Sequence, residues 1–579
     1  MAYYLGIFGG EGTTNASAAL TNGNKIIAFA EEERFNRIKN SPSHLPIKSI
    51  IFCLKKAKIN INKIKAIGFG WDCIHQTNNV DKIKKKIHSK FNSINNSYNR
   101  NLEKKFTLGL NYKKIRKELK WSLSRYNEKL GNKKITFIKH HLCHAASSFY
   151  VSGFKDSLIL VLDGMGEEMT GAIYQGKGEK IKVLKKFFLP NTLGGYYSTF
   201  TDFFGFKALS EEGKLMALAA YGKYSKKIQK KLNKFLSYDE KGNFSLNPNL
   251  RFSSNRNFSQ RYSDTFVKIF GKPRLPGQKI TKFHKNLAFN VQFRLEEIVK
   301  LLVRKYMRSN KQKNLCLAGG VHMNCKLNGE LSKLGEVKNI FIQPASSDNG
   351  VSLGAAIILA KKYEAKKFTK LENVYYGPEF SNKEILDSIK EAKLNFRKSN
   401  NIFFETAKYL SNGKIVGWFQ GRSEVGARAL GNRSILANPM IGNMRYKLNK
   451  EVKHRELWRP FCPSVNDTHF KEYFKDCSDS PYMILALPVK EYYRKKFDSS
   501  VHIDGTARPQ VVTKKSNIKY WKLIDQFGKI TGHPILINTS FNIQGEPIVN
   551  TPSNAIRCFF GTGIDILVLN NFIITKKNY

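Results

Sequence analysis

The chain has 579 residues, of which 41% are hydrophobic and 12% aromatic. This composition excludes a disordered chain, and the length predicts about two to four domains rather than one core. Eight cysteines without a C-x-x-C pair argue against a disulfide framework or a zinc knuckle. The N-terminus has no leader-like apolar region and no run of about 18 apolar residues follows, which predicts a cytoplasmic protein without a membrane span.

The formal net charge of +53 is the strongest feature of the composition. Basic surfaces bind phosphate through counterion release, so this charge raises the alternative of a nucleic-acid partner. The basic residues are mostly lysines, however, and they are spread along the chain beside many asparagines and isoleucines. We favour a composition bias of the source genome over a nucleic-acid partner. In either case the charge would attract small anionic substrates.

In the N-terminal part, apolar strands alternate with turns and helices. Strands are predicted over 3–8, at the start of 25–35 and over 64–71, and the lysine-rich stretch 82–134 is predicted to be a solvated helical insertion. Residues 134–153 have helical spacing. An apolar strand then ends at Asp163, two more strands cover 171–175 and 180–188, and strand–turn–helix units follow at 314–324 and 339–363.

Repeated strand–turn–helix units predict an α/β body whose site lies at the ends of the strands. We expect this body to close near residue 370, because Pro and Gly at 375–380 mark a boundary. Blocks rich in Arg and Gly follow at 417–434 and 452–464. The sequence therefore predicts one domain over 1–370 and a second α/β domain over 371–579 that binds anions.

The stretch HHLCHAASS contains a candidate metal site. His140 and His144 lie four residues apart in a predicted helix and project from one face, although such pairs also occur as ordinary surface residues. Asp163 and Asp348 follow apolar strands, where open α/β folds place ligands, but a lone Asp is more often a turn or helix-cap residue. Two imidazoles and two carboxylates suit a cation such as iron, manganese or zinc.

Two glycine-containing segments are candidate phosphate or nucleotide contacts. The segment 318–324 opens a predicted helix, so the amides around Gly319 and Gly320 are placed to bind a phosphate. A plain strand-to-helix turn is the equal alternative. Gly213 and Lys214 are similarly ambiguous, because they lack the preceding glycine of a P-loop.

Arginines of the C-terminal domain recur in segments rich in Gly, Pro and Asn rather than along one exposed helix face. Guanidinium groups pair with phosphate oxygens, which predicts an anion site, with ordinary surface arginines as the alternative. The strand-like run LINTSFN adds alternate polar side chains that face one way and suit an amide or carboxyl group. The candidates are Arg428, Arg433, Lys453, Arg455, Arg459, Arg508, Asn538, Ser540 and Asn542.

Stretches along the whole chain resemble the carbamoyltransferase family that contains the nodulation-protein and cephamycin carbamoyltransferases. Within this family, they resemble the tobramycin O-carbamoyltransferase most strongly. They include AFAEEERFNRIK, HHLCHAASSFY, LDGMGEE, PASSDNGVSLGAA, EVGARALGNRS, VKHRELWRPFCPS and NTSFNIQGEPIV. The resemblance implies an actin-like ATPase (ASKHA) domain, akin to proteins that make threonylcarbamoyladenosine in tRNA, followed by a YrdC-like domain.

The resemblance also implies an enzyme. In such enzymes carbamoyl phosphate and ATP, with Mg²⁺, form carbamoyl adenylate, and the carbamoyl group then passes to the hydroxyl of a small sugar-like or secondary-metabolite acceptor at an iron site. By resemblance, the metal ligands are His140, His144, Asp163 and Asp348. The carbamoyl phosphate contacts are Lys453, Arg459, Arg508, Asn538, Ser540 and Asn542, with Arg428 and Arg433 nearby, and the adenylate contacts are Lys39, Gly320 and Asn324, with Gly213 and Lys214 close by.

One position departs from the family pattern. Relatives carry a histidine before the ASAAL-like run, and that histidine resembles the general base for the acceptor hydroxyl. Thr14 stands there in this chain, and threonine does not take up a proton near neutral pH. Glu11 and, more weakly, His322 are the alternatives. Thr14 therefore leaves open a non-catalytic homologue that binds metal and nucleotide. The charge and the kinship with threonylcarbamoyladenosine synthesis leave open a tRNA-modifying or RNA-binding relative.

Overall fold

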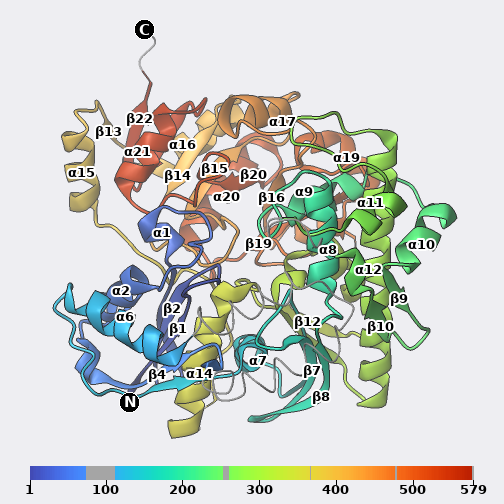
Figure 1. Ribbon diagram of the computed structural model, residues 1–579. Helices are drawn as coiled ribbons and strands as arrows, with labels where there is room; N and C mark the ends of the chain where they lie inside the picture. The colour runs from blue at the N-terminus through green and yellow to red at the C-terminus, as the bar shows by residue number, and fades with distance from the viewer. Residues whose placement is uncertain (74–110, 252–259, 365–366, 476–478, 577–579) are drawn as a thin grey trace. The chain divides into compact units, whose positions relative to one another are not determined.

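A computed structural model describes residues 1–73, 111–251, 260–364, 367–475 and 479–576 (Figure 1). The chain divides into two compact units, which we call the N unit, residues 1–32 and 40–370, and the C unit, residues 33–39 and 371–579. The short segment 33–39, which the sequence assigns to the first domain, packs with the second. Residues 82–110 of the predicted lysine-rich insertion lie outside the described part of the chain.

Two five-stranded sheets of the N unit share one topology. In each sheet three strands form an antiparallel meander, and two further strands pair in parallel beside the meander's first strand. This duplicated arrangement is that of an actin-like ATPase domain, so the predicted fold class is confirmed. In spatial order the sheets are β3 (Lys25–Glu31), β2 (Ser17–Asn22), β1 (Tyr3–Phe8), β4 (Ile64–Phe69), β5 (Ile135–Phe137), and β12 (Asn339–Ile342), β11 (Asn314–Ala318), β6 (Asp156–Leu162), β7 (Met169–Lys177), β8 (Lys180–Phe188).

Helices cover these sheets and supply the segments of the site. The lysine-rich helix α6 begins at an Asn111 cap, whose side chain accepts from two backbone amides. The helices are α2 (Ile47–Ala57), α6 (Tyr112–Ser124), α7 (His140–Ser152), α8 (Leu193–Phe203), α9 (Glu212–Ala219), α10 (Lys226–Asn233), α11 (Asp264–Phe270), α12 (Lys282–Ser309), α13 (Cys325–Ser332) and α14 (Val351–Glu364).

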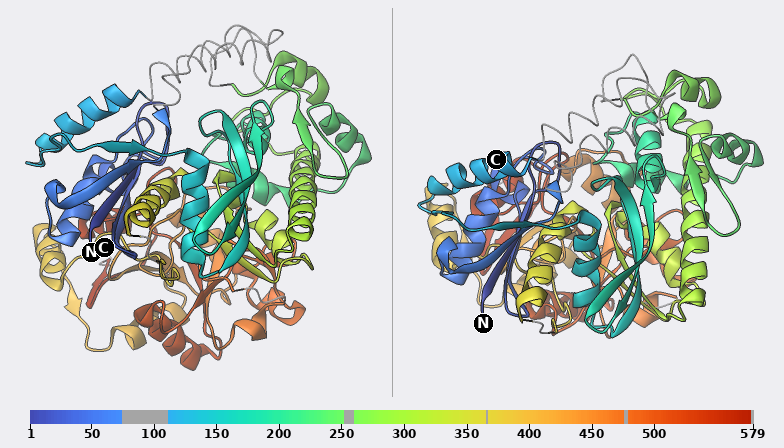
Figure 2. Two further views of the ribbon diagram at one scale, coloured as in Figure 1. Left: turned by 90° about the horizontal axis from the view of Figure 1, so that it is seen from below. Right: turned by 60° about the horizontal axis from the view of Figure 1, so that its bottom comes forward.

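Two glycines allow α14 to approach its neighbours closely. A Cβ added at Gly6 of β1 would overlap the carbonyl oxygen of Ser352, and one added at Gly354 of α14 would overlap that of Cys143 in α7. Helix α14 therefore lies against both β1 and α7, as the views of Figure 2 show. Because Asp348 immediately precedes α14, this close packing brings its turn beside the start of α7.

One eight-stranded sheet forms the centre of the C unit. Its two faces carry separate apolar clusters, one with Trp418, Leu436 and Leu536 against α16 and α20, and one with Ile435, Ile537 and Phe541 against α15 and α21. The unit is α/β as expected, and its likeness to YrdC stays a prediction. The sheet order is β13 (Arg397–Lys398), β22 (Phe572–Thr575), β21 (Ile566–Leu569), β14 (Val416–Phe419), β15 (Arg433–Ala437), β20 (Ile535–Ser540), β16 (Cys462–Asn466), β19 (Gln510–Val512), and the helices named are α15 (Asn382–Glu391), α16 (Ile402–Ser411), α20 (Ile518–Thr531) and α21 (Pro552–Phe560).

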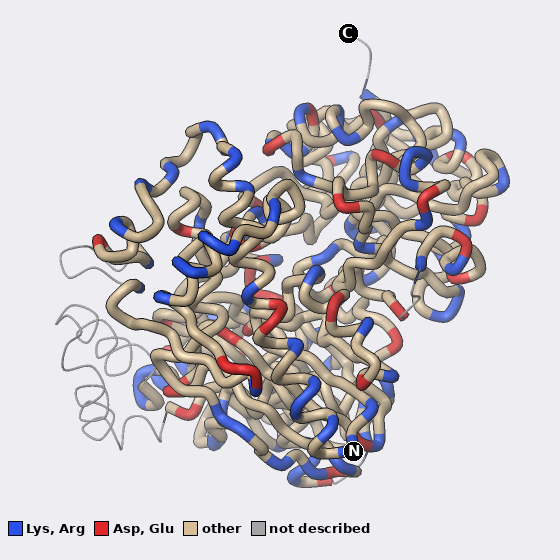
Figure 3. The backbone as a smooth tube through the Cα atoms, turned by 90° about the vertical axis from the view of Figure 1, so that its right-hand side faces the viewer, with Lys and Arg blue, Asp and Glu red and all other residues tan. Residues whose placement is uncertain are grey.

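The basic residues are distributed over many elements. In Figure 3, Lys and Arg lie on most segments of the visible face, and Asp and Glu are interspersed among them. This distribution fits the compositional interpretation of the charge better than a single basic groove. No helix within the described ranges is long and apolar enough to cross a membrane.

Candidate metal centre and anion site

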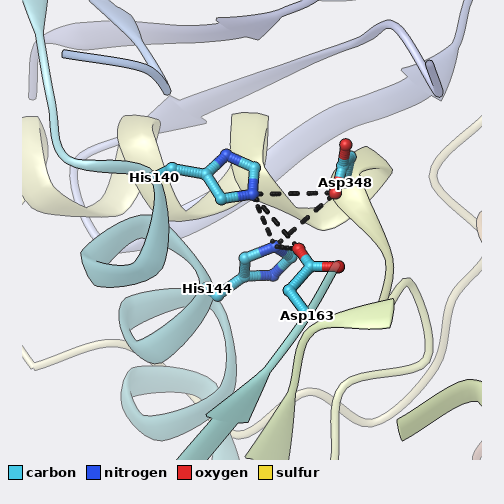
Figure 4. Close-up of side chains that lie close together, drawn as sticks. All are labelled: His140, His144, Asp163 and Asp348. Carbon is cyan, nitrogen blue, oxygen red and sulfur yellow. Dashed lines mark hydrogen bonds and ion pairs between the residues drawn. The ribbon is translucent and has the colours of Figure 1, made fainter. Parts of the chain in front are cut away.

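Four side chains of the N unit converge at the start of α7. His140 and His144 project from the first turns of this helix, Asp163 directly follows β6, and Asp348 lies in the turn before α14 (Figure 4). One ligand atom from each residue lies within 4.8 Å of all the others. Asp163 Oδ2 is 3.3 Å from Nε2 of each histidine, and Asp348 Oδ1 is 3.6 Å from His140 Nε2. The structure thus brings together all four predicted ligands.

Neighbouring groups orient His140. Its Nδ1 lies 3.2 Å from the carbonyl oxygen of Gly70, so Nδ1–H donates there and Nε2 faces the cluster. The buried carboxylate of Glu167 accepts from the backbone N–H of His140 at 2.8 Å and from that of Asp72 at 2.9 Å. Sequence reasoning missed Glu167, although it belongs to the quoted LDGMGEE stretch.

Within the cluster, His140 and Asp163 stabilise each other's charged forms. Burial disfavours the charged ring of His140, but hydrogen bonds with Asp163 and Asp348 prevail and raise its pKa to about 10. Burial would raise the pKa of Asp163, and hydrogen bonds with His140 and His144 instead hold it well below its usual value. Two imidazole nitrogens and two carboxylates at these distances form a donor set that fits a first-row divalent cation.

The predicted nucleotide residues of the N unit fall into two groups. Gly319 has a φ of 93°, and the backbone N–H of Gly320 lies 3.3 Å from Asp163 Oδ1, so this turn adjoins the metal cluster. Asn324 caps α13, and its amide also donates to Gln292 at 2.8 Å. Gly213 and Lys214 instead lie within α9, where Lys214 forms a 2.7 Å ion pair with Glu211.

Thr14 lies near the turn that carries Asp348. The amide of Asn15 donates to both Thr14 Oγ1, at 3.2 Å, and the hydroxyl of Ser347, at 3.4 Å, and Ser347 immediately precedes Asp348.

The two alternative candidates for the general base differ in their exposure to solvent. Glu11 forms an ion pair with exposed Lys114 of α6. His322 is fully buried, and burial lowers its pKa to about 4.

In the C unit, Lys453 joins two of the predicted anion contacts. Its ammonium donates to the carbonyl oxygens of Ser540 and Asn542, each at 2.7 Å, and to the Asn542 side chain at 2.7 Å. All of these acceptors are neutral. Burial, and after it the charge of Arg455, lower the pKa of Lys453 well below its usual value. The three N–H donors of Lys453 therefore go to neutral oxygens, and burial disfavours its charged form.

Two arginines contact residues at the start of strand β16. Arg455 stacks on Phe461 with 4.6 Å between the guanidinium carbon and the ring centre, and it donates to Asn449 at 2.7 Å. Burial lowers the pKa of Arg455 well below its usual value, and the charge of Arg459 lowers it further. Arg508 donates to the sulfur of Cys462 from Nη2 at 2.9 Å and from Nε at 3.2 Å.

Arg433 has a different environment. Its fully buried guanidinium donates to four backbone carbonyls, those of Pro378, Gln420, Gly421 and Asn432, and lies 3.6 Å above the Phe419 ring. In the register of β15 with β20, Ser434 pairs with Ser540, so Arg433 projects to the opposite sheet face. These contacts fit a structural role, and we leave Arg433 out of the proposed anion site. Arg428 is half-buried on the loop between β14 and β15.

Lys39 belongs to the segment 33–39, which packs with the C unit. Arg34 donates to the carbonyl of Gly426 at 2.7 Å, and Arg37 donates to those of Ile548 at 2.6 Å and Pro547 at 2.8 Å. The charge of Lys39 also contributes to the lowered pKa of Lys453. Lys39 therefore belongs with the cations around Lys453 rather than with Gly320 and Asn324, a grouping that sequence proximity did not reveal.

Comparison with known proteins identifies the family. The model of the carbamoyltransferase N-terminus matches residues 8–357, and that of the carbamoyltransferase C-terminus matches residues 407–576. The chain is 33% identical to nodulation protein NolNO of Sinorhizobium fredii, over 97% of this chain and 79% of that protein. It is 34% identical to an uncharacterised protein of Synechocystis, over 97% and 95%, and 35% identical to nodulation protein NolO of Bradyrhizobium diazoefficiens, over 76% and 79%.

The chain therefore belongs to the carbamoyltransferase family and is an enzyme that transfers carbamoyl groups. The family resemblance predicted from the sequence is confirmed. The closer likeness to the tobramycin enzyme stays a prediction.

Proposed function

We propose that the C unit activates carbamoyl phosphate with ATP, and that the N unit transfers the carbamoyl group to the hydroxyl of a small acceptor. The observation that carries this proposal is the group of cations around buried Lys453, whose own hydrogen bonds go to neutral oxygens. Carbamoyl phosphate and ATP are polyanions that would neutralise these charges. Arg455, Arg459, Arg508 and Lys39 complete the group.

In the activation step, carbamoyl phosphate loses its phosphate to water and becomes carbamate. A carbamate oxygen then attacks the α-phosphorus of ATP, which forms carbamoyl adenylate and releases pyrophosphate. The cations around Lys453 stabilise the negative charge that gathers on the phosphate oxygens, and their fixed positions spare the cost of reorganisation. Mg²⁺ would accompany ATP as its usual counterion.

In the transfer step, the oxygen of the acceptor hydroxyl attacks the carbamoyl carbon, and the bond to the adenylate oxygen breaks as AMP leaves. His140, His144, Asp163 and Asp348 would hold a cation, iron or another first-row divalent metal, whose chemistry is to polarise a carbonyl as a Lewis acid. The Gly319–Gly320 turn lies beside Asp163, to which the backbone N–H of Gly320 donates at 3.3 Å, so the backbone at Gly320 lies next to the group that would hold the cation. The hydroxyl proton needs a base, and Glu11 and His322 are the candidates.

The proposal is tested by giving the purified protein carbamoyl phosphate, ATP and Mg²⁺ and measuring pyrophosphate. Pyrophosphate release that depends on carbamoyl phosphate is expected, and Arg459→Ala should lower it by at least about tenfold, because a charged hydrogen-bond donor is lost. Arg445→Ala is the matched control, since Arg445 pairs with exposed Asp498 at 2.9 Å in the same unit. Equal activity of the two variants would contradict the site assignment.

A further inference from the structure

Cys462 lies among the residues of the proposed anion site. It begins β16 and stands directly opposite Asn538 of β20 in the antiparallel register. Side chains of directly opposed residues share one face of the sheet, so Cys462 and Asn538 face the same side. Ser464, two residues further along β16, also faces this side and accepts from the Asn538 amide at 3.0 Å. The thiol therefore borders the predicted carbamoyl phosphate contact Asn538.

The surroundings of the sulfur are positively charged. Arg508 donates two N–H groups to it, and Arg455 and Arg459 lie close by. The sulfur of cysteine is the nucleophile in thiol–disulfide exchange, and the Cys462 sulfur lies within hydrogen-bond distance of the Arg508 guanidinium. The same arginines are the groups that would attract a phosphate.

The side chain of Asn538 is a second feature that favours ligand binding at this place. Its Nδ2 donates to Ser464 and to Gln510, each at 3.0 Å, which fixes the orientation of the amide. Its Oδ1 then has no hydrogen-bond partner among the described residues, although the residue is only 1% exposed. A buried acceptor without a donor is costly, so a ligand with an N–H group fits here, and the carbamoyl group has one.

The other described cysteines have different environments. Cys53, Cys73, Cys143 and Cys316 are fully buried, Cys325 is 7% exposed with its sulfur 3.8 Å from that of Met216, and Cys462 is 8% exposed. Cys558 is 5% exposed and offers the best internal comparison, because burial raises its pKa to about 11. Its thiol is therefore expected to react slowly at neutral pH.

We propose that Cys462 is a modification site for small disulfides, and that a mixed disulfide at Cys462 and carbamoyl phosphate exclude each other from the proposed anion site. The identity of the competing substrate rests on the function proposed above. The Cys462 thiolate attacks one sulfur of the small disulfide, a new S–S bond forms, and the other half leaves as a thiolate. An added thiol attacks the mixed disulfide and restores Cys462.

The test uses the full chain and dithiodipyridine, a neutral disulfide whose leaving group absorbs light, with peptide mass spectrometry to locate the label. Cys462 should react at least about tenfold faster than Cys558. Saturating carbamoyl phosphate should slow the reaction at Cys462 by about tenfold, inorganic phosphate should slow it less, and neither should affect Cys558. In Cys558→Ser the fast reaction should persist, and in Cys462→Ser it should be absent.

Activity gives a second measurement. Labelled protein should lose pyrophosphate formation and regain it with dithiothreitol, while Cys462→Ser should keep the same activity before and after treatment, whatever its starting value. Equal labelling of Cys462 and Cys558, or labelling of Cys462 that carbamoyl phosphate does not slow, would overturn the proposal. Labelling requires no turnover and no variant, so its outcome is separate from failure of the proposed reaction.

Discussion

The Nε2 atoms of His140 and His144 lie 3.2 Å apart, one helical turn from each other on α7. Asp163 Oδ2 lies 3.3 Å from both nitrogens. Two ring nitrogens held this close are poorly satisfied by each other, because only one proton can lie between them. A shared cation would satisfy both lone pairs and the carboxylate at once.

Removal of one imidazole should therefore abolish tight metal binding. We expect His144→Ala to bind a divalent first-row metal at least about a hundredfold more weakly, since loss of an outer-shell partner alone costs about 10–100-fold. His141→Phe is the control on the same helix, because the His141 ring nitrogens have no hydrogen-bond partner among the described residues. Metal content after dialysis and calorimetric titration measure the effect. Equal metal content in both variants would exclude this cluster as the metal site.

The close packing of α14 should make Gly354 intolerant of a side chain. Gly354→Ala would push a methyl group into the backbone of Cys143, and we expect a loss of about 1–3 kcal/mol in the free energy of unfolding. Gly213→Ala provides a matched control, because Gly213 lies in α9 and its added Cβ meets no atom within 4 Å. Chemical denaturation of the two variants compares them directly. A smaller loss for Gly354→Ala than for Gly213→Ala would refute the packing argument.

Arg433 and Arg459 should separate stability from activity. Arg433→Leu leaves three buried carbonyl oxygens and the part-buried one of Gly421 without this donor, so we expect a loss of about 3 kcal/mol in the free energy of unfolding. Arg459→Ala should reduce pyrophosphate formation with little change in stability. Denaturant titrations and the activity assay on the same preparations provide the comparison. A stable Arg433→Leu variant that fails only to bind carbamoyl phosphate would restore Arg433 to the anion site.

Position 14 should control transfer rather than activation. Thr14→His places an imidazole beside the Asp348 side of the cluster, and a positioned base contributes about 10²–10⁴-fold to proton-transfer catalysis. We expect faster carbamoylation of hydroxyl acceptors at unchanged pyrophosphate formation, with Thr14→Gln as a control that adds length without a base. Product analysis by mass spectrometry over a panel of hydroxyl acceptors measures the difference. If the two variants transfer equally, position 14 does not supply the base.

The sequence predicted the parts of the molecule that depend on local geometry. The i, i+4 spacing of His140 and His144 fixes their common direction once the helix forms, and the apolar run of β6 ends directly at Asp163. The face to which Arg433 projects could not be predicted, because it depends on the pairing of β15 with β20. The contribution of Glu167 was also hidden, since its partners are the backbone N–H groups of His140 and Asp72, which no motif records.

Residues 33–39 leave the N unit between β3 and α2, pack in the C unit through Arg34 and Arg37, and return. The two units are consequently not separable by a single cut of the chain. A fragment that begins at residue 371 lacks this strip, with its three backbone-anchoring hydrogen bonds and with Lys39. Exchange of residues 371–579 between relatives would likewise transfer the C unit without this segment, so a working chimera must exchange residues 33–39 together with residues 371–579.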